Sequence, residues 1–306
     1  MILDLNEDHS ENIPYSHPEY FLFIEEDRLS QYPGYMALSH WHSEVEFVVV
    51  LFGELDYNVN GKVIRLQEGD GLFVNSRQLH YGFSKARREC RFLCILLHPR
   101  LLCSTLSMEQ EYVAPILSNP ALFCQPLHTS VDWERKILQA LLRMHDCLDQ
   151  PAFPLQILGL FCEIWQELYI HAPGEQTFLG KPSGQLNAVR DMVTYIQDHY
   201  AEKITLEEIA ASGNVCKSKC CSLFNKYLGQ SPVRYLISYR LEKSVERMAS
   251  TDLSISEIGY EVGFLGPSYF SETFRKQYGC SPGKYREKHF GKECGKRQDE
   301  GACANP

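Results

Sequence analysis

Two nine-residue segments decide the architecture of the C-terminal part of this chain: FNKYLGQSP at residues 224–232 and FRKQYGCSP at residues 274–282. Both follow the pattern F-x-K-x-x-G-x-S-P, and they lie 50 residues apart. Upstream, Glu208-Ile209-Ala210 and Glu257-Ile258-Gly259 repeat a second signal at matched spacing. A fixed period with matched internal spacing indicates a duplicated supersecondary unit.

Each copy begins with the signals of a short helix. Thr205 and Ser254 are each followed three residues later by a glutamate, and this capping box predicts a helix start at each hydroxyl residue. Gly213 and Gly263 follow at the other end. We expect both glycines to end their helices in the left-handed conformation, which glycine adopts at little cost.

A second helix is predicted in each copy, over residues 217–228 and 267–278, and Gly229 and Gly279 stop these helices. A short helix, a tight turn and a second helix form the helix-turn-helix plan, in which the second helix enters the DNA major groove. The alternative for either copy alone is a packed helical hairpin with no role in DNA binding. Two copies with shared caps and stops favour the DNA-binding interpretation.

Polar side chains on the two second helices are the predicted DNA contacts. Cationic groups neutralise phosphates, while hydroxyl, amide and guanidinium groups reach base edges. The predicted DNA-binding residues are Lys217, Ser218, Lys219, Ser222, Asn225 and Lys226 in the first copy and Ser268, Tyr269, Ser271, Glu272, Arg275 and Lys276 in the second.

A connecting helix that starts at Ser231-Pro232 is predicted between the two copies. With it, the stretch from about Leu186 to Lys288 resembles the DNA-binding domain of the AraC/XylS family of transcription regulators. The residues that carry the resemblance include the blocks 255–264 and 268–286. The resemblance implies two helix-turn-helix units joined by one rigid helix and reading two successive major-groove faces.

The charge of the chain is uneven. Residues 1–184 hold 13 Lys and Arg against 24 Asp and Glu, whereas residues 185–306 hold 17 against 15. The net charge of −9 therefore lies in the N-terminal part, and basic side chains cluster on the predicted recognition helices. Weak overall basicity predicts DNA binding that depends on dimerisation as well as on charge.

From Tyr20 to about Leu97 the periodicity is that of short strands. Apolar runs alternate with turn signals, and Asn60-Gly61 between two such runs is a strong signal for a two-residue hairpin. Many short strands at regular spacing predict a sandwich or a barrel. The predicted strands include residues 21–24, 45–51, 62–66, 71–74 and 91–97.

This region also carries histidines at a characteristic spacing. The pattern G-x5-H-x-H-x3-E-x6-G spans residues 34–53, and G-x5-N-x4-H spans residues 69–80. It resembles the two motifs of the cupin family, a small jelly-roll barrel, with Asn75 and Arg77 in place of the usual proline and glycine. In metal-dependent cupins the counterparts of His40, His42, Glu46 and His80 bind a divalent metal.

Regulators that resemble this chain bind a small effector in such a barrel. The predicted effector-binding residues are His40, Trp41, His42, Glu46, Tyr57 and His80. Aromatic rings beside hydrogen-bonding groups suit a small polar, sugar-like molecule. We expect no cofactor, and two alternatives stay open: a divalent metal on His40, His42, Glu46 and His80, or aromatic residues that are only barrel core.

Beyond the barrel, residues 131–148 and 155–169 show apolar residues at helical spacing over wide faces. In regulators of this type such a pair makes the dimer interface, and the alternative is an ordinary intramolecular hairpin. Pro173-Gly174 and Lys181-Pro182 are typical of a linker.

The sequence therefore predicts an α+β two-domain protein. A cupin-like β-barrel of the jelly-roll type over residues 1–130 and a helical pair over 131–171 form the N-terminal part. An all-α double helix-turn-helix domain over residues 186–290 forms the C-terminal part. A linker over 172–185 and a disordered tail over 291–306 complete the prediction.

The predicted function is that of a cytoplasmic, homodimeric transcription regulator without enzymatic activity. Its expected partners are double-stranded DNA, a small-molecule effector and, for an activator, RNA polymerase. The sequence has no continuous apolar run of about 18 residues, the length that a membrane helix needs. The acidic N-terminus does not resemble a signal peptide. Two other classes stay open: a metal-dependent cupin enzyme fused to a DNA-binding domain, and an architectural DNA binder whose barrel only dimerises.

Overall fold

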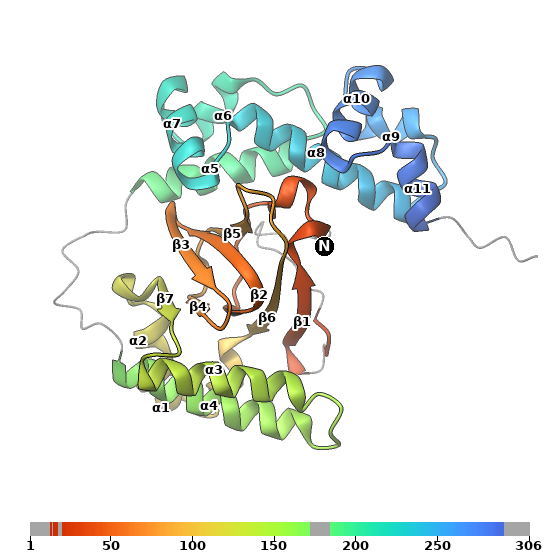
Figure 1. Ribbon diagram of the computed structural model, residues 1–306. Coiled ribbons are helices and arrows are strands. Elements are labelled where there is room, and N and C mark those ends of the chain that lie inside the picture. The colour runs from red at the N-terminus through yellow and green to blue at the C-terminus, as the bar shows by residue number, and fades with distance from the viewer. Residues whose placement is uncertain (1–12, 14, 18–19, 172–183, 291–306) are drawn as a thin grey trace, which may run out of the picture.

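The computed structural model describes residues 13, 15–17, 20–171 and 184–290. Its elements form three tiers (Figure 1): the C-terminal helices at the top, the strands in the middle, and the helices α3 (Asp132–Asp146) and α4 (Phe153–His171) at the bottom. The predicted tail and nearly all of the predicted linker lie outside the described residues. Within these ranges, no helix combines the length and the apolar character needed to span a bilayer.

One long strand organises the N-terminal domain. The first half of β2 pairs with β6 and β4, its second half pairs with β3 and β5, and a bulge between Val50 and Phe52 separates the halves. The two groups of strands form two layers, one on each half of β2. Because β2 belongs to both layers, the sheet folds back on itself as a small barrel. The described strands are β1 (Leu22–Arg28), β2 (Val45–Val59), β3 (Lys62–Gln67), β4 (Gly71–Val74), β5 (His80–Phe83), β6 (Cys90–Leu97) and β7 (Cys124–Leu127).

The predicted hairpin between β2 and β3 is confirmed. Val59 pairs with Lys62, and the two residues between them, Asn60 and Gly61, have φ angles of 51° and 84°. Two consecutive positive φ angles define the turn that matches the twist of the flanking strands, which is why Asn-Gly is favoured there.

The sequence did not predict the strands β5 and β7. All four residues of β5 are buried, so this strand shows no alternation of apolar and polar residues. Strand β7 is short, contains Pro126 and pairs only with β4 at the sheet edge. Neither strand carries a periodic pattern that a single sequence could reveal.

Helices cover one end of the barrel. The pair α3 and α4 falls where the two helices were predicted and shares a buried core with the strands, which includes Phe47, Phe73, Leu138 and Phe161. Between β6 and β7 lie α1 (Leu106–Met108), a π-helical turn (Glu109–Val113) and α2 (Ala114–Leu117), which the sequence did not predict.

The C-terminal domain contains two helix-turn-helix units around one connecting helix, α8. Both capping boxes are present, because Thr205 and Ser254 each exchange hydrogen bonds with the glutamate three residues later. The described helices are α5 (Gly184–His199), α6 (Leu206–Ser212), α7 (Lys217–Leu228), α8 (Pro232–Ser250), α9 (Ile255–Glu261), α10 (Pro267–Tyr278) and α11 (Pro282–Phe290). Helix α5 begins inside the range that was predicted as linker.

The prediction for the end of α6 was wrong in one respect. Gly213 has a φ of −88°, and the left-handed residue is its neighbour Asn214, with a φ of 54°. Position 213 requires a glycine because of space and not because of its backbone conformation. A Cβ there would lie 2.7 Å from the backbone oxygen of Ala188 and from Cγ of Met192. The glycine therefore permits close packing of α6 on α5. In the second copy Gly263 takes the expected left-handed conformation, with a φ of 89°.

The barrel and the first helix-turn-helix unit share one hydrophobic core. Leu38, Trp41 and Leu79 of the barrel lie in the same buried cluster as Phe224 of α7 and Tyr235 of α8. These barrel residues are at most 7% exposed. Fully burying one such side chain contributes roughly 1.5–3 kcal/mol, so the two domains stabilise each other through this contact.

Candidate functional site

The two recognition helices, α7 and α10, are both fixed in the domain by buried apolar residues on their inner faces. Leu223 and Phe224 bury the inner face of α7, and Phe270 and Phe274 bury the inner face of α10. Each helix ends at a left-handed glycine. Figure 1 shows the two helices near opposite ends of α8, at the edge of the molecule farthest from α3 and α4.

The predicted DNA contacts lie on the outer faces of these helices. Ser271 is half-buried, and the other eleven residues are exposed. Two of the cations already have acidic partners: Lys217 contacts Glu207, and Lys276 Nζ lies 2.7 Å from Glu272 Oε1. A DNA phosphate can replace these partners, because exposed ion pairs contribute little stability.

Inside the barrel the structure brings five of the six predicted effector-binding residues together. The ring centroids of His40, His42 and His80 lie 4.5 to 5.8 Å apart. Glu46 Oε2 lies 2.9 Å from His80 Nε2, and the Tyr57 hydroxyl donates to Glu46 Oε1 at 2.9 Å. Because nearly all of these side chains are buried, the cluster lies in a medium of low polarity.

His40 and His42, two residues apart in the sequence, do not share a regular strand. His40 forms an isolated bridge with His80, and His42 lies in the irregular segment before β2. Backbone carbonyls orient the rings, since His40 Nδ1 lies 2.8 Å from the oxygen of Leu38 and His80 Nδ1 lies 2.7 Å from that of Gln78. An Nδ1–H that donates to a carbonyl leaves Nε2 facing the cluster.

The protonation states follow from burial and from close charges. Burial lowers the pKa of His40 to about 4 and lowers the pKa of His42 well below its usual value. Burial acts to raise the pKa of Glu46, but the charge and hydrogen bond of His80 outweigh it and lower that pKa to about 2. Burial also raises the pKa of Tyr57 well above its usual value. At neutral pH the cluster therefore contains an ionised Glu46 beside neutral His40, His42 and Tyr57.

The donor set of this cluster also fits a metal ion. One ring nitrogen from each of His40, His42 and His80 lies within 4.8 Å of the others. His42 Nε2 is buried and has no hydrogen-bond partner among the described residues. Three imidazoles and the Glu46 carboxylate suit zinc, iron, manganese or nickel, and such an ion would supply Lewis-acid chemistry. The same groups can equally donate and accept hydrogen bonds to a hydroxylated ligand.

Trp41, the sixth predicted effector-binding residue, belongs to the core between the domains. It is 7% exposed and packs in the cluster that contains Phe224 and Tyr235. Its chain neighbour His40 belongs to the polar cluster. The two consecutive residues therefore connect the inside of the barrel to α7 and α8.

One residue of the cluster was missed by the sequence analysis. Cys94 Sγ lies 3.5 Å from Glu46 Oε1. Cys94 stands on β6 opposite Val48 of β2, and this register brings it beside Glu46. No spacing in the sequence connects residues 46 and 94, so only the strand pairing could reveal the contact.

Comparison with known proteins assigns both domains. Residues 209–288 match the family model described as a helix-turn-helix domain, and residues 29–96 match the one described as a cupin domain. The chain is 30% identical over 259 residues to the uncharacterized HTH-type transcriptional regulator YdeC of Bacillus subtilis, which covers 83% of this chain and 87% of that protein.

Two more distant proteins resemble the chain over most of its length. The melibiose operon regulatory protein of Escherichia coli is 20% identical over 259 residues, covering 83% of this chain and 85% of that protein. The crystal structure of an apo ToxT variant from Vibrio cholerae superposes with a TM-score of 0.44 at 13% identity, covering 87% of this chain and 97% of that one.

Proposed function

The chain belongs to the AraC family of helix-turn-helix transcriptional regulators, and we propose that it regulates transcription in response to a small polar effector bound in its cupin barrel. On this proposal, the exposed polar residues of α7 and α10 contact the DNA. His40, His42, Glu46, Tyr57 and His80 contact the effector, and Trp41 connects the effector site to the DNA-binding domain.

A sugar-like effector suits the chemistry of the polar cluster. Glu46 offers carboxylate oxygens, His42 offers an unpartnered ring nitrogen, and Tyr57 offers a flat aromatic face with a hydroxyl. Sugars bind through such combinations of hydrogen bonds and ring stacking. The name of the melibiose operon regulatory protein, which is similar along its length, supports a sugar for this chain as well.

The observation that carries the proposal is the core shared by the two domains. Glu46 and His80 are 4% and 1% exposed, so an effector enters only if the surrounding segments move. Leu38 lies two residues before His40 and Trp41 directly after it, and both belong to the buried core that includes residues of α8. A movement that admits the effector therefore displaces the contacts that hold the first helix-turn-helix unit. An effector that binds the two arrangements with different affinity shifts the balance between them.

Dimerisation through α4 is part of the proposal. Leu155 and Ile170 on this helix are 74% and 60% exposed, although the opposite face of the helix is buried in the core. Exposed apolar residues on one helix suit contact with a second copy. Two copies would present four helix-turn-helix units to DNA. The additional DNA contacts would compensate for the low net positive charge of each DNA-binding domain. An activator of this type would also contact RNA polymerase.

The competing function is that of a metal-dependent cupin enzyme fused to the DNA-binding domain. The convergence of three imidazoles with Glu46 favours it specifically. A double substitution, His40→Ala with His42→Ala, separates the two functions. An enzyme would lose turnover, whereas a sensor would lose only its response to the effector and would keep its DNA affinity.

The test of the proposal is a comparison of DNA affinity with and without sugars. A binding duplex is first selected from random sequences with the full-length protein. Its affinity is then measured by fluorescence anisotropy in the presence of a panel of monosaccharides and disaccharides. We expect one sugar to change the affinity at least tenfold in the wild type and the effect to be lost in His80→Ala. The variant Tyr20→Phe, at an exposed site, should respond as the wild type does. Equal affinity under all conditions would refute the proposal.

A further inference from the structure

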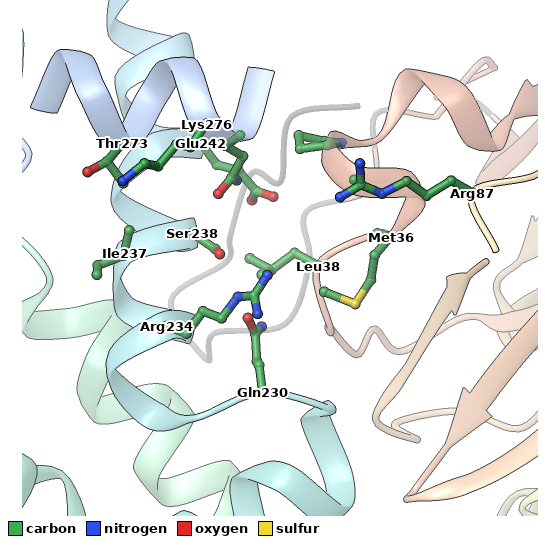
Figure 2. A pocket seen from close by; sticks show the side chains of 14 residues that line it. Met36, Leu38, Arg87, Gln230, Arg234, Ile237, Ser238, Glu242, Thr273 and Lys276 are labelled. Atoms are coloured by element: carbon green, nitrogen blue, oxygen red, sulfur yellow. The ribbon is translucent and has the colours of Figure 1, made fainter. Parts of the chain in front are cut away.

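A cavity lies between the barrel and the C-terminal domain, outside the polar cluster. Its volume is about 260 Å³, just below the range of pockets that hold drug-sized ligands. Its walls come from the 3₁₀ turn Pro33–Tyr35 and the segment after it, from Arg87, and from α8 and α10 (Figure 2). The cavity therefore contacts the barrel, the connecting helix and the second recognition helix together.

Two arginines face this cavity from opposite domains. Figure 2 shows Arg87 reaching in from the barrel side and Arg234 from α8. Neither guanidinium has an acidic partner within ion-pair distance in the part of the chain that the structure describes. Lys276 of α10 also lines the cavity, but its charge is already paired with Glu272, and Glu242 is the single acidic residue of the lining. The lining thus carries a net positive charge, which favours an anionic occupant.

A buried amide completes the polar wall. Gln230 joins α7 to α8 and is 5% exposed, and Figure 2 shows its side chain directed toward Arg234. Its side-chain oxygen is buried and has no hydrogen-bond partner among the described residues. A buried acceptor without a partner is energetically unfavourable, because it has lost its hydrogen bonds to water. A ligand that donates a hydroxyl to Gln230 would remove that cost.

We propose that this cavity binds a small organic anion, a carboxylate or a phosphate that also carries hydroxyl groups. Arg87 and Arg234 hold the anionic group from the two sides, because guanidinium groups match carboxylate and phosphate oxygens in geometry. Gln230 and Ser238 contact the hydroxyl groups. This site is separate from the polar cluster inside the barrel and takes a charged ligand, whereas the barrel site takes a neutral one.

The position of the site gives the ligand an effect on DNA binding. Lys276 and Thr273 of α10 line the cavity, and Lys276 is also a predicted DNA contact. An anion in the cavity competes with a DNA phosphate for this lysine and holds α10 against the barrel. Linkage then requires that the anion lower DNA affinity and that DNA lower the affinity for the anion by the same factor.

The binding test uses the full-length protein without DNA. Isothermal titration calorimetry is run with glucose 6-phosphate, glucuronate, inorganic phosphate and neutral glucose. We expect glucose 6-phosphate or glucuronate to bind more tightly than glucose. Comparing the affinities of these two anions reports whether the site selects phosphate or carboxylate. In Arg87→Gln and in Arg234→Gln the affinity should fall at least tenfold. Both arginines are exposed, so these variants are expected to fold.

Two controls place the binding at this cavity. Arg88→Gln removes a neighbouring exposed arginine that does not line the cavity and should bind as the wild type does. His80→Ala disrupts the cluster inside the barrel and should also keep the anion affinity, so a failure of the barrel proposal is distinguished from a failure of this one. The proposal is overturned if neither organic anion binds, if only inorganic phosphate binds, if glucose binds as tightly, or if Arg88→Gln loses as much affinity as Arg87→Gln.

Discussion

The hydroxyl of Tyr235, at the buried face of α8, donates a hydrogen bond to the backbone oxygen of Ser39 in the barrel, 3.4 Å away. Ser39 directly precedes His40, which belongs to the polar cluster inside the barrel. A single residue therefore separates the cluster from the helix that joins the two helix-turn-helix units. This contact and the apolar core around it couple the two domains structurally.

The first prediction concerns this shared core. Trp41→Ala should lower the free energy of unfolding by roughly 3–5 kcal/mol, as truncation of a buried tryptophan does. We expect the wild type to melt in one transition in differential scanning calorimetry, and because the lost contacts lie between the domains, the variant should melt in two. Trp133→Ala is the matched control, since Trp133 packs on the core of the barrel and its helices. That variant should melt earlier but in one step. One transition in Trp41→Ala would contradict the coupling.

The second prediction is loss of stability in mild acid. In the unfolded chain His40 takes up a proton near pH 6.5, whereas in the folded protein its pKa is lowered to about 4. The unfolded state therefore binds more protons below pH 6.5, and stability falls as the pH drops toward 4. Between pH 7 and pH 5 this histidine should cost roughly 2 kcal/mol, measured by urea unfolding. His40→Gln should remove that part of the pH dependence, and an unchanged slope in the variant would contradict the assignment.

The third prediction concerns the metal alternative. We expect the purified protein to contain divalent metal at well below one ion per chain in elemental analysis, and we expect its melting temperature to be unchanged by a chelator. That result would leave the cluster as side chains that hydrogen-bond to one another without a bound ion. One equivalent of zinc, iron, manganese or nickel that disappears in His42→Ala would instead establish the metal site.

The fourth prediction concerns the recognition helix α7. Lys219 is exposed on its polar face, and Lys219→Gln should weaken binding about equally for all DNA sequences. The slope of log affinity against log salt should fall in magnitude by about 1, because one phosphate contact is lost. Lys85→Gln, which removes an exposed lysine of the barrel, should leave the slope unchanged. An unaltered slope in Lys219→Gln would place this residue off the DNA.

The fifth prediction concerns the dimer. Leu155→Glu combined with Ile170→Glu places two carboxylates on the exposed apolar face of α4. Burying these charges in a dimer interface would require their desolvation. Self-association, measured by analytical ultracentrifugation, should therefore weaken at least tenfold. Val63→Glu, at an exposed apolar residue of β3, is the control and should not change the association. A monomeric wild type, or equal weakening in both variants, would remove α4 as the interface.

Local signals predicted much of the fold correctly. The two capping boxes, the limits of α7 and α10 and the Asn60-Gly61 hairpin all depend on interactions within a few residues, and the sequence states them directly. The unpredicted elements lack such signals. Strand β5 is buried on both faces, and the left-handed position after α6 belongs to Asn214 because Gly213 is used for close packing on α5.

The sequence by itself determined the duplicated helix-turn-helix units and the histidine spacing of the barrel, because hydrogen bonds and side-chain periodicity over short distances leave a readable pattern. Only the tertiary structure decided that Cys94 lies beside Glu46, that Trp41 belongs to a core shared with α7 and α8, and that Arg87 and Arg234 face one cavity. Those contacts join residues far apart in the chain. Their geometry depends on strand register and on how the two domains pack, and neither is encoded at any fixed spacing.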